Sequence, residues 1–178
     1  MYRDILAFWF EETKPKSWWI ADPEFDALIR SRFEGVLHQA AQCELFGWRN
    51  SPKGRLAEII VLDQFSRNIY RNTPMAFAQD PLALALAQEA ITAGADNVLK
   101  PLERSFLFLP FMHSESRIIH ERAEILYREN GLEDNYQFEL RHKAIIDRFG
   151  RYPHRNEILG RMSSEEEIDF LKQSGSKF

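Results

Sequence analysis

The chain has 178 residues, 44% hydrophobic and 28% charged, which is the composition of one folded domain spanning residues 1–178 and not of a disordered chain. Its formal net charge of −4 argues against a general nucleic-acid binder. No apolar run approaches the ~20 residues that a membrane-spanning helix needs, so we expect no membrane partner.

Proline marks the starts of the helices that are predicted in the first half of the chain. Residues 4–12 form a short amphipathic helix, and apolar side chains at spacings of three and four predict a longer helix over residues 22–46. An N-cap residue followed by proline, which fits the first helical position, predicts four helix starts. They are Asp22-Pro23, Ser51-Pro52, Thr73-Pro74 and Asp80-Pro81.

The helix that begins at Pro52 has a polar stripe within an otherwise apolar sequence. Asp63, Arg67 and Arg71 follow one another at four-residue spacing and so share a face, with Asn68 beside them. An exposed pair of Asp63 and Arg67 would contribute only ~0.3–0.5 kcal/mol, too little to matter for the fold. The stripe is therefore either a surface charge ladder or one wall of a polar pocket.

An apolar helix is predicted over residues 82–93, and a longer helix over residues 101–129 contains Pro110. Because proline removes a backbone hydrogen bond, the longer helix should bend just before His113 and Glu115. A histidine near a carboxylate suits general acid–base chemistry near neutral pH. His113 and Glu115 lack the spacing of metal ligands on one helix face, so we expect no metal site.

The C-terminal part is predicted to contain a helix that ends at Gly150, a short turn of helix after Pro153, and a last helix that begins with a capping-box pattern at Ser163 and Ser164. No segment of the chain shows strand-like alternation. We therefore predict an all-α fold of seven to eight helices, arranged as stacked antiparallel helical hairpins.

Residues 148–156 concentrate polar side chains. Gly150 and Pro153 interrupt this stretch, so it is predicted to be a helix end that continues into a loop. Guanidinium groups bind carboxylates and phosphates in a bidentate geometry, so the arginines here either converge on one anion or clamp neighbouring helices. Both readings are open. The candidate binding residues in this stretch are Arg148, Arg151, His154, Arg155 and Asn156.

Several remaining side chains are predicted to have structural roles. Cys43 is the only cysteine, so no intramolecular disulfide can form; because a secretory signal pattern is also missing from the first residues, we expect a cytoplasmic location. Cys43 lies on an apolar helical stretch and is predicted to be a small core residue. Trp18 and Trp19 are predicted to pack on the core, with the alternative that one of them lies over a groove as a lid. His142 is predicted to be a hydrogen-bonded core histidine.

Three motifs together give the chain a family resemblance. They are residues 62–68 (LDQFSRN), residues 103–115 (ERSFLFLPFMHSE) and residues 148–156 (RFGRYPHRN), followed by Leu159-Gly160-Arg161. In this order they resemble the bacterial domain-of-unknown-function family 924, and the likeness extends to the Phe8-Trp9-Phe10 start and covers nearly the whole chain. Phe108 departs from the tyrosine expected in many members, which puts one hydrogen bond in doubt.

The resemblance implies an all-helical fold similar to the tetratricopeptide-like superfamily, and it implies no established activity. It also implies that the polar residues named above match positions of the family's motifs. These positions are Asp63, Arg67, Asn68, His113, Glu115, Arg148, Arg151, His154, Arg155 and Asn156.

Three functions fit the sequence. The first is binding of an anionic small molecule or an acidic peptide end in a pocket built from the three polar blocks. The second is an enzyme in which His113 or His154 is the acid–base group and Glu115 or Asp63 orients it, acting on a phosphorylated or carboxylated substrate. The third is RNA contact through residues 141–161, which the acidic remainder of the chain disfavours. No glycine-rich phosphate loop, serine elbow or cysteine nucleophile motif occurs, and we expect no cofactor.

Overall fold

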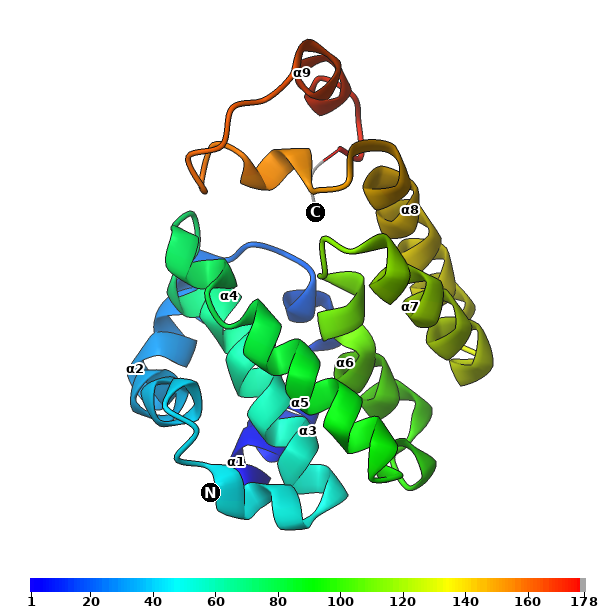
Figure 1. The fold of residues 1–178 in the computed structure, drawn as a ribbon. Helices are drawn as coiled ribbons and strands as arrows, with labels where there is room; N and C mark the ends of the chain where they lie inside the picture. The colour runs from blue at the N-terminus through cyan, green and yellow to red at the C-terminus, as the bar shows by residue number, and fades with distance from the viewer. Residues whose placement is uncertain (177–178) are drawn as a thin grey trace.

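The computed structural model describes residues 1–176, and every regular element in that range is helical (Figure 1). This confirms the predicted all-α fold. The α-helices are α1 (Tyr2–Ala7), α2 (Pro23–Ala41), α3 (Pro52–Ile60), α4 (Ser66–Ile69), α5 (Asp80–Thr92), α6 (Pro101–Met112), α7 (Arg117–Asn130), α8 (Glu133–Phe149) and α9 (Glu165–Leu171). None of these helices is long and apolar enough to cross a bilayer.

Shorter helical stretches join the α-helices. Two of them are π-helical: Phe8–Glu12 continues α1, and Val61–Phe65 connects α3 to α4 without a break in the helical path. The 3₁₀ turns are Pro15–Trp18, Phe46–Asn50, Pro74–Phe77, Ala95–Asn97 and Pro153–Arg155. The predicted helix from Pro52 is thus one long rod that ends at Ile69. Asp63 and Arg67 of the polar stripe contact each other at 3.2 Å, but Arg71 lies beyond the helix end.

Two of the four predicted N-caps form. The Asp22 carboxylate accepts hydrogen bonds from backbone N–H groups in the first turn of α2, and the Ser51 hydroxyl accepts one from Gly54 in α3. Thr73 makes no such bond to its 3₁₀ turn. A helix does start at Asp80-Pro81, but the N-cap role predicted for Asp80 is wrong: it is the first residue of α5, and its carboxylate binds two arginines instead of the helix end.

The helix predicted over residues 22–46 ends at Ala41, five residues early. Ala40 is its last buried residue, and Cys43 then adopts the left-handed conformation with φ of 59°. Cys43 is exposed, so its prediction as a core residue is wrong. The apolar pattern continues to Leu45, which is 6% exposed and belongs to the core, but the left-handed turn at Cys43 ends the helix before that residue.

The predicted helix over residues 101–129 is two helices, α6 and α7, joined by a tight turn. Pro110 lies in the last turn of α6, which ends two residues later at Met112. Because proline cannot donate the next backbone hydrogen bond, the helix is weakened where it was expected only to bend. The turn lifts His113 and Glu115 out of the helix, which places them at the end of α6.

The core is built around the rod formed by α3, the π stretch and α4. Leu56, Ile60 and Phe65 are at most 1% exposed, and Phe65 packs against Trp9 with ring centroids 5.6 Å apart. Full burial of such side chains contributes about 1.5–3 kcal/mol each. Trp18 and Trp19 both contact Phe106, although Trp19 remains 57% exposed.

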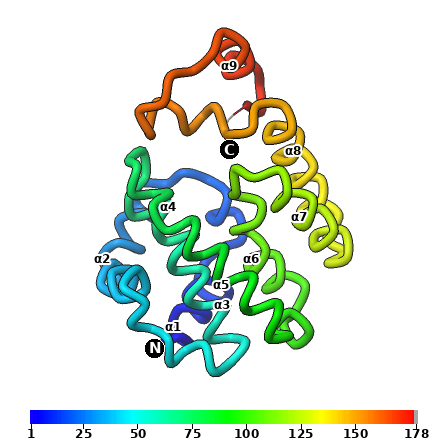
Figure 2. Tube along the Cα trace, in the orientation of Figure 1, coloured from blue at the N-terminus to red at the C-terminus, as the bar shows by residue number. Residues whose placement is uncertain are grey.

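The last part of the chain folds back over one end of this helical body. Helices α6, α7 and α8 pack in sequence, α7 between its two neighbours, and the chain then reverses at Gly150, whose φ of 70° suits glycine. Residues 151–176, here called the C-terminal cap, cross above the ends of α4 and α6 (Figures 1 and 2). Tyr152 anchors the cap: it is fully buried, and its hydroxyl donates to the Met112 carbonyl.

Candidate functional site

A pocket of about 370 Å³ lies where the C-terminal cap meets the helical body. Its walls come from three separate segments: the start of α5 with the turn before it, the end of α6 with the turn after it, and the cap. Most of the wall is apolar, with a few polar side chains among the apolar ones. The lining residues are Pro74, Phe77, Ala78, Asp80, Pro81, Leu84, Pro110, His113, Ser114, Glu115, Arg155 and Leu159.

Asp63 supports His113 from behind this wall. Asp63 lies in the π stretch, is 1% exposed, and its Oδ1 is 2.8 Å from Nδ1 of His113. Gln64 donates to its other oxygen at 2.7 Å, and Arg67 lies 3.2 Å away. Burial alone would raise the pKa of Asp63, but the charge of Arg67 and the bond to His113 hold it well below its usual range. Asp63 is therefore ionised.

His113 lines the pocket, and its Nδ1 is the ring nitrogen that contacts Asp63. Burial lowers the pKa of His113 and the nearby Arg67 guanidinium lowers it further, so the ring is neutral at pH 7 although Asp63 opposes the shift. An ionised carboxylate can only accept hydrogen bonds, so the ring proton is on Nδ1, facing Asp63. Nε2 then carries a lone pair, and no hydrogen bond within residues 1–176 engages it.

Asp80 connects the helical body to the cap. It accepts a bidentate pair of hydrogen bonds from Arg67 at 2.9 and 3.0 Å, and a further bond from Arg155 at 3.2 Å. The Arg155 guanidinium lies between the rings of Phe77 and Tyr152, 4.6 and 4.7 Å from their centroids. Asp80 thus pairs with two cations, and Arg67 has a second carboxylate, Asp63, at 3.2 Å.

Arg155 is the least compensated charge in the pocket wall. Its side chain is 7% exposed, its Nε has no hydrogen-bond partner in the part of the chain that the structure describes, and no bond there engages Nη2. Burial lowers the pKa of Arg155 and the like charge of Arg67 lowers it further, which Asp80 offsets only in part. An additional negative charge beside Arg155 would therefore be stabilised.

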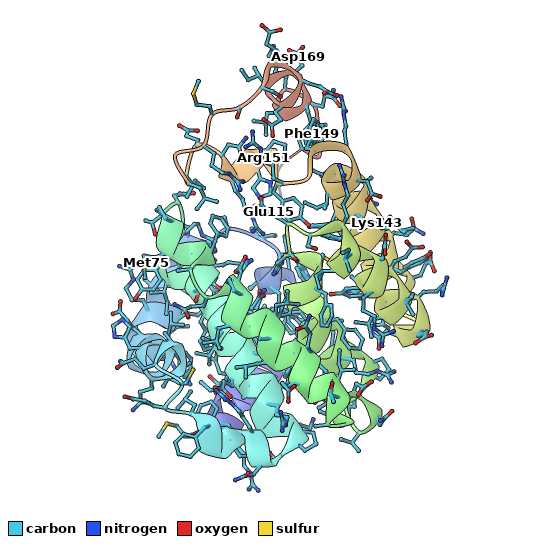
Figure 3. The ribbon with its side chains drawn as sticks, in the orientation of Figure 1. Met75, Glu115, Lys143, Phe149, Arg151 and Asp169 are labelled. Carbon is cyan, nitrogen blue, oxygen red and sulfur yellow. The ribbon has the colours of Figure 1, made fainter. Side chains whose placement is uncertain are left out.

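Glu115 holds the cap in place and does not orient His113. It accepts a hydrogen bond of 2.7 Å from the backbone N–H of Tyr152 and two from Arg161 at 2.6 and 2.9 Å. Burial would raise the pKa of Glu115, but the bonds from Arg161 and Tyr152 outweigh it, so the pKa is lowered. Figure 3 shows Glu115 below the cap, in which Arg151 lies. Of the two predicted orienting carboxylates, only Asp63 contacts the histidine.

Asn68 and Arg71 face away from the pocket. Both bind Asp26 on α2: Asn68 donates at 2.8 Å, and Arg71 donates twice at 2.5 and 2.7 Å. Neither residue lines the pocket. These two predicted site residues therefore clamp α4 to α2.

Most polar side chains of the predicted basic loop bind other residues of the C-terminal part. Arg148 and Arg151 each form a salt bridge with a glutamate of α9, Glu166 and Glu167, at 2.7 and 2.6 Å. Asn156 donates to Ser163 and accepts from Arg161. His154 is half-buried beside Tyr152, and burial with the nearby Arg155 charge lowers its pKa to about 4. The arginines of this loop therefore do not converge: among them only Arg155 reaches the pocket.

Asp80 and Arg161 were not predicted to belong to a site. Asp80 was assigned to a helix start, and Arg161 appeared only within the third motif. The local sequence of Asp80 fits a helix cap equally well. Its role is visible only in the fold, which brings Asp80 next to Arg155, 75 residues away in the sequence.

No group of three or more His, Cys, Asp or Glu side chains in residues 1–176 is arranged to hold a metal ion. His120, whose spacing to Glu124 suits two ligands on one helix face, binds Glu139 at 2.7 Å and the Ser114 carbonyl at 2.8 Å instead. The prediction for His142 is confirmed: it is 6% exposed and bonds to the Phe138 carbonyl.

Comparisons with known proteins agree with the motif resemblance. The chain is similar to a solved protein of unknown function, ATU0120 from Agrobacterium tumefaciens, with 38% identity and a TM-score of 0.91 over 96% of each chain. No curated protein matched. Residues 5–175 match a family described as "Bacterial protein of unknown function (DUF924)". Because this match covers nearly the whole length, the chain belongs to the DUF924 family.

Proposed function

We propose that the pocket under the C-terminal cap binds an anionic small molecule, or the acidic end of a peptide, through Arg155. The observation that supports this most is the incomplete compensation of Arg155, whose Nη2 makes no hydrogen bond within residues 1–176. A carboxylate or phosphate oxygen is the group that a guanidinium binds best. The apolar part of the ligand would lie against Phe77, Leu84 and Leu159.

The two carboxylates in the pocket wall do not oppose this proposal strongly. Both Asp80 oxygens accept hydrogen bonds from arginines, and both Glu115 oxygens are bound by Arg161. Their charges are therefore already neutralised by fixed cations. A ligand anion placed beside Arg155 would meet a positive charge that shares its one carboxylate with Arg67.

Thermal unfolding with a panel of carboxylates, phosphate esters and short acidic peptides tests the proposal. A bound anion should raise the melting temperature of the wild type, with about 2.7 kcal/mol of added stability at a concentration of 100 Kd. Arg155→Met keeps most of the side-chain volume and should abolish the response. Arg148→Met is the matched control, since Arg148 binds Glu166 outside the pocket and its loss should leave the response intact. An unchanged response in Arg155→Met, or no response of the wild type to any anion, would refute the proposal.

A second candidate function, acid–base catalysis, is favoured by the pair of Asp63 and His113. A carboxylate that fixes the imidazole tautomer from behind is the usual support for a general base. We expect any hydrolytic activity found by a broad substrate screen to fall about a hundredfold or more in His113→Gln and to persist in His154→Gln, because His113 lines the pocket and contacts the buried carboxylate of Asp63. Equal activity of His113→Gln and the wild type would exclude this role.

A further inference from the structure

We propose that the ligand of this pocket has, besides its anionic group, a hydrogen-bond donor such as a hydroxyl, which donates to Nε2 of His113. This inference rests on the proposed anion-binding function and deepens it by naming the class of ligand. The candidate class is a hydroxylated carboxylate or phosphate ester with an apolar chain.

The hydrogen bonds around Asp63 determine which ring nitrogen of His113 carries the proton. The two carboxylate oxygens of Asp63 face Gln64, Arg67 and His113, and the first two can only donate through the atoms that reach Asp63. Asp63 is thus surrounded by donors, so Nδ1 of His113 is a third donor. The ring then offers a hydrogen-bond acceptor to the pocket and repels a second lone pair placed against it.

The charges that face His113 keep it from becoming a donor. Arg67 reaches it from the helical rod, while Asp63 on the same rod and Asp80 on α5 oppose Arg67. The ring is enclosed by these groups, so gaining a second proton would place a new cation next to the Arg67 guanidinium. Near neutral pH the pocket therefore presents two unlike partners, an acceptor at His113 and a donor at Arg155.

Because the pocket wall is mostly apolar, binding should be weaker for a ligand that has no hydrogen-bond donor for Nε2 of His113. Pro110 and Leu84 line the pocket with His113, so a ligand that fills this space removes water from Nε2. A ligand without a donor would leave a desolvated acceptor unpaired, which we expect to weaken binding about tenfold, on the scale of one hydrogen bond. An anionic group placed at His113 would be disfavoured for the same reason, so the anionic end is directed to Arg155.

Matched pairs of probes test the inference. The carboxylate series is hexanoate against 2-, 3- and 4-hydroxyhexanoate and their methyl ethers, and the phosphate series is butyl phosphate against 4-hydroxybutyl phosphate. In isothermal titration of the wild type, at least one hydroxylated probe should bind about tenfold more tightly than its parent and its ether. Parent and hydroxylated probes that bind within twofold of each other throughout would overturn the inference while the anion site stands. No binding by any probe would refute the anion site itself.

Two variants and one direct measurement separate His113 from other sources of the preference. His113→Phe should remove the preference for the hydroxyl and keep binding of the parent anion, whereas a preference that survives would overturn the inference. Asp63→Asn replaces the carboxylate by an amide, which can donate as well as accept, so the ring proton of His113 should no longer be held on Nδ1. Nitrogen-15 NMR of the free wild type, which needs no variant to fold, should show a protonated Nδ1 and an unprotonated Nε2 for His113. A protonated Nε2 would overturn the inference.

Discussion

Arg155 in the C-terminal cap donates a hydrogen bond of 3.2 Å to Asp80 at the start of α5, and both residues line the pocket. The same carboxylate is bound by Arg67. Asp80 therefore helps to tie the cap to the body, and it limits the charge that Arg155 can offer to a ligand.

Replacing this carboxylate should separate stability from binding. Asp80→Asn leaves Arg67 and Arg155 close together without their shared counter-ion, so we expect the free energy of unfolding to fall by about 2–3 kcal/mol, less than for a fully buried pair because Asp80 is 17% exposed. Affinity for an anionic ligand should rise, since the ligand replaces the lost charge. Urea unfolding and titration of the same variant measure both quantities.

Asp169→Asn is the control for this variant, because Asp169 forms only an exposed pair with Lys172 and its loss should have an effect below about 0.5 kcal/mol. A fall in both stability and anion affinity in Asp80→Asn would contradict the role assigned to Asp80.

The bond between Glu115 and Arg161 should make attachment of the cap dependent on pH. The pKa of Glu115 is lowered in the folded state, so its contribution to stability is present above its ordinary value of 4.5 and is lost as pH falls through the folded value. We expect limited proteolysis within residues 151–176 to accelerate below pH 4.5 in the wild type. Glu115→Gln should be cleaved more rapidly already at pH 7, with a weaker pH dependence.

Equal cleavage rates for Glu115→Gln and the wild type at pH 7 would show that this glutamate does not hold the cap. Glu166→Gln gives a matched control, since Glu166 binds Arg148 in an exposed pair at the surface of α9. Its cleavage should follow the wild type.

Local sequence predicted the elements that are governed by local rules. The Asp22 and Ser51 caps, the capping box of Ser164 and the helix end at Gly150 each depend on backbone groups within a few residues, and all of them form. The end of α2 before Cys43 could not be predicted from local rules, because an apolar pattern shows which residues are buried but not where the helix ends. The likeness to the tetratricopeptide superfamily stays a prediction.

The pairing of charges was beyond local rules. Glu115 is two residues from His113 and Asp63 is fifty away, yet Asp63 binds the histidine because the turn after α6 directs Glu115 to Arg161. A sequence contains the candidates for an ion pair, but only the packing of α6 against the helical rod selects among them. The residues of the three motifs were therefore foreseeable as a group, and their division between clamp and pocket was not.

Burial of His142 predicts a loss of stability in mild acid. Burial lowers the pKa of His142 from 6.5 to about 3, so the unfolded chain binds a proton at this residue before the folded protein does. The free energy of unfolding should therefore fall as pH drops below 6.5, by about 2 kcal/mol between pH 7 and pH 5 for this residue alone.

His142→Asn, which keeps a donor for the Phe138 carbonyl, should lose correspondingly less stability over the same pH interval, as measured by urea unfolding. A His142→Asn curve parallel to the wild type would mean that His142 is protonated equally in both states.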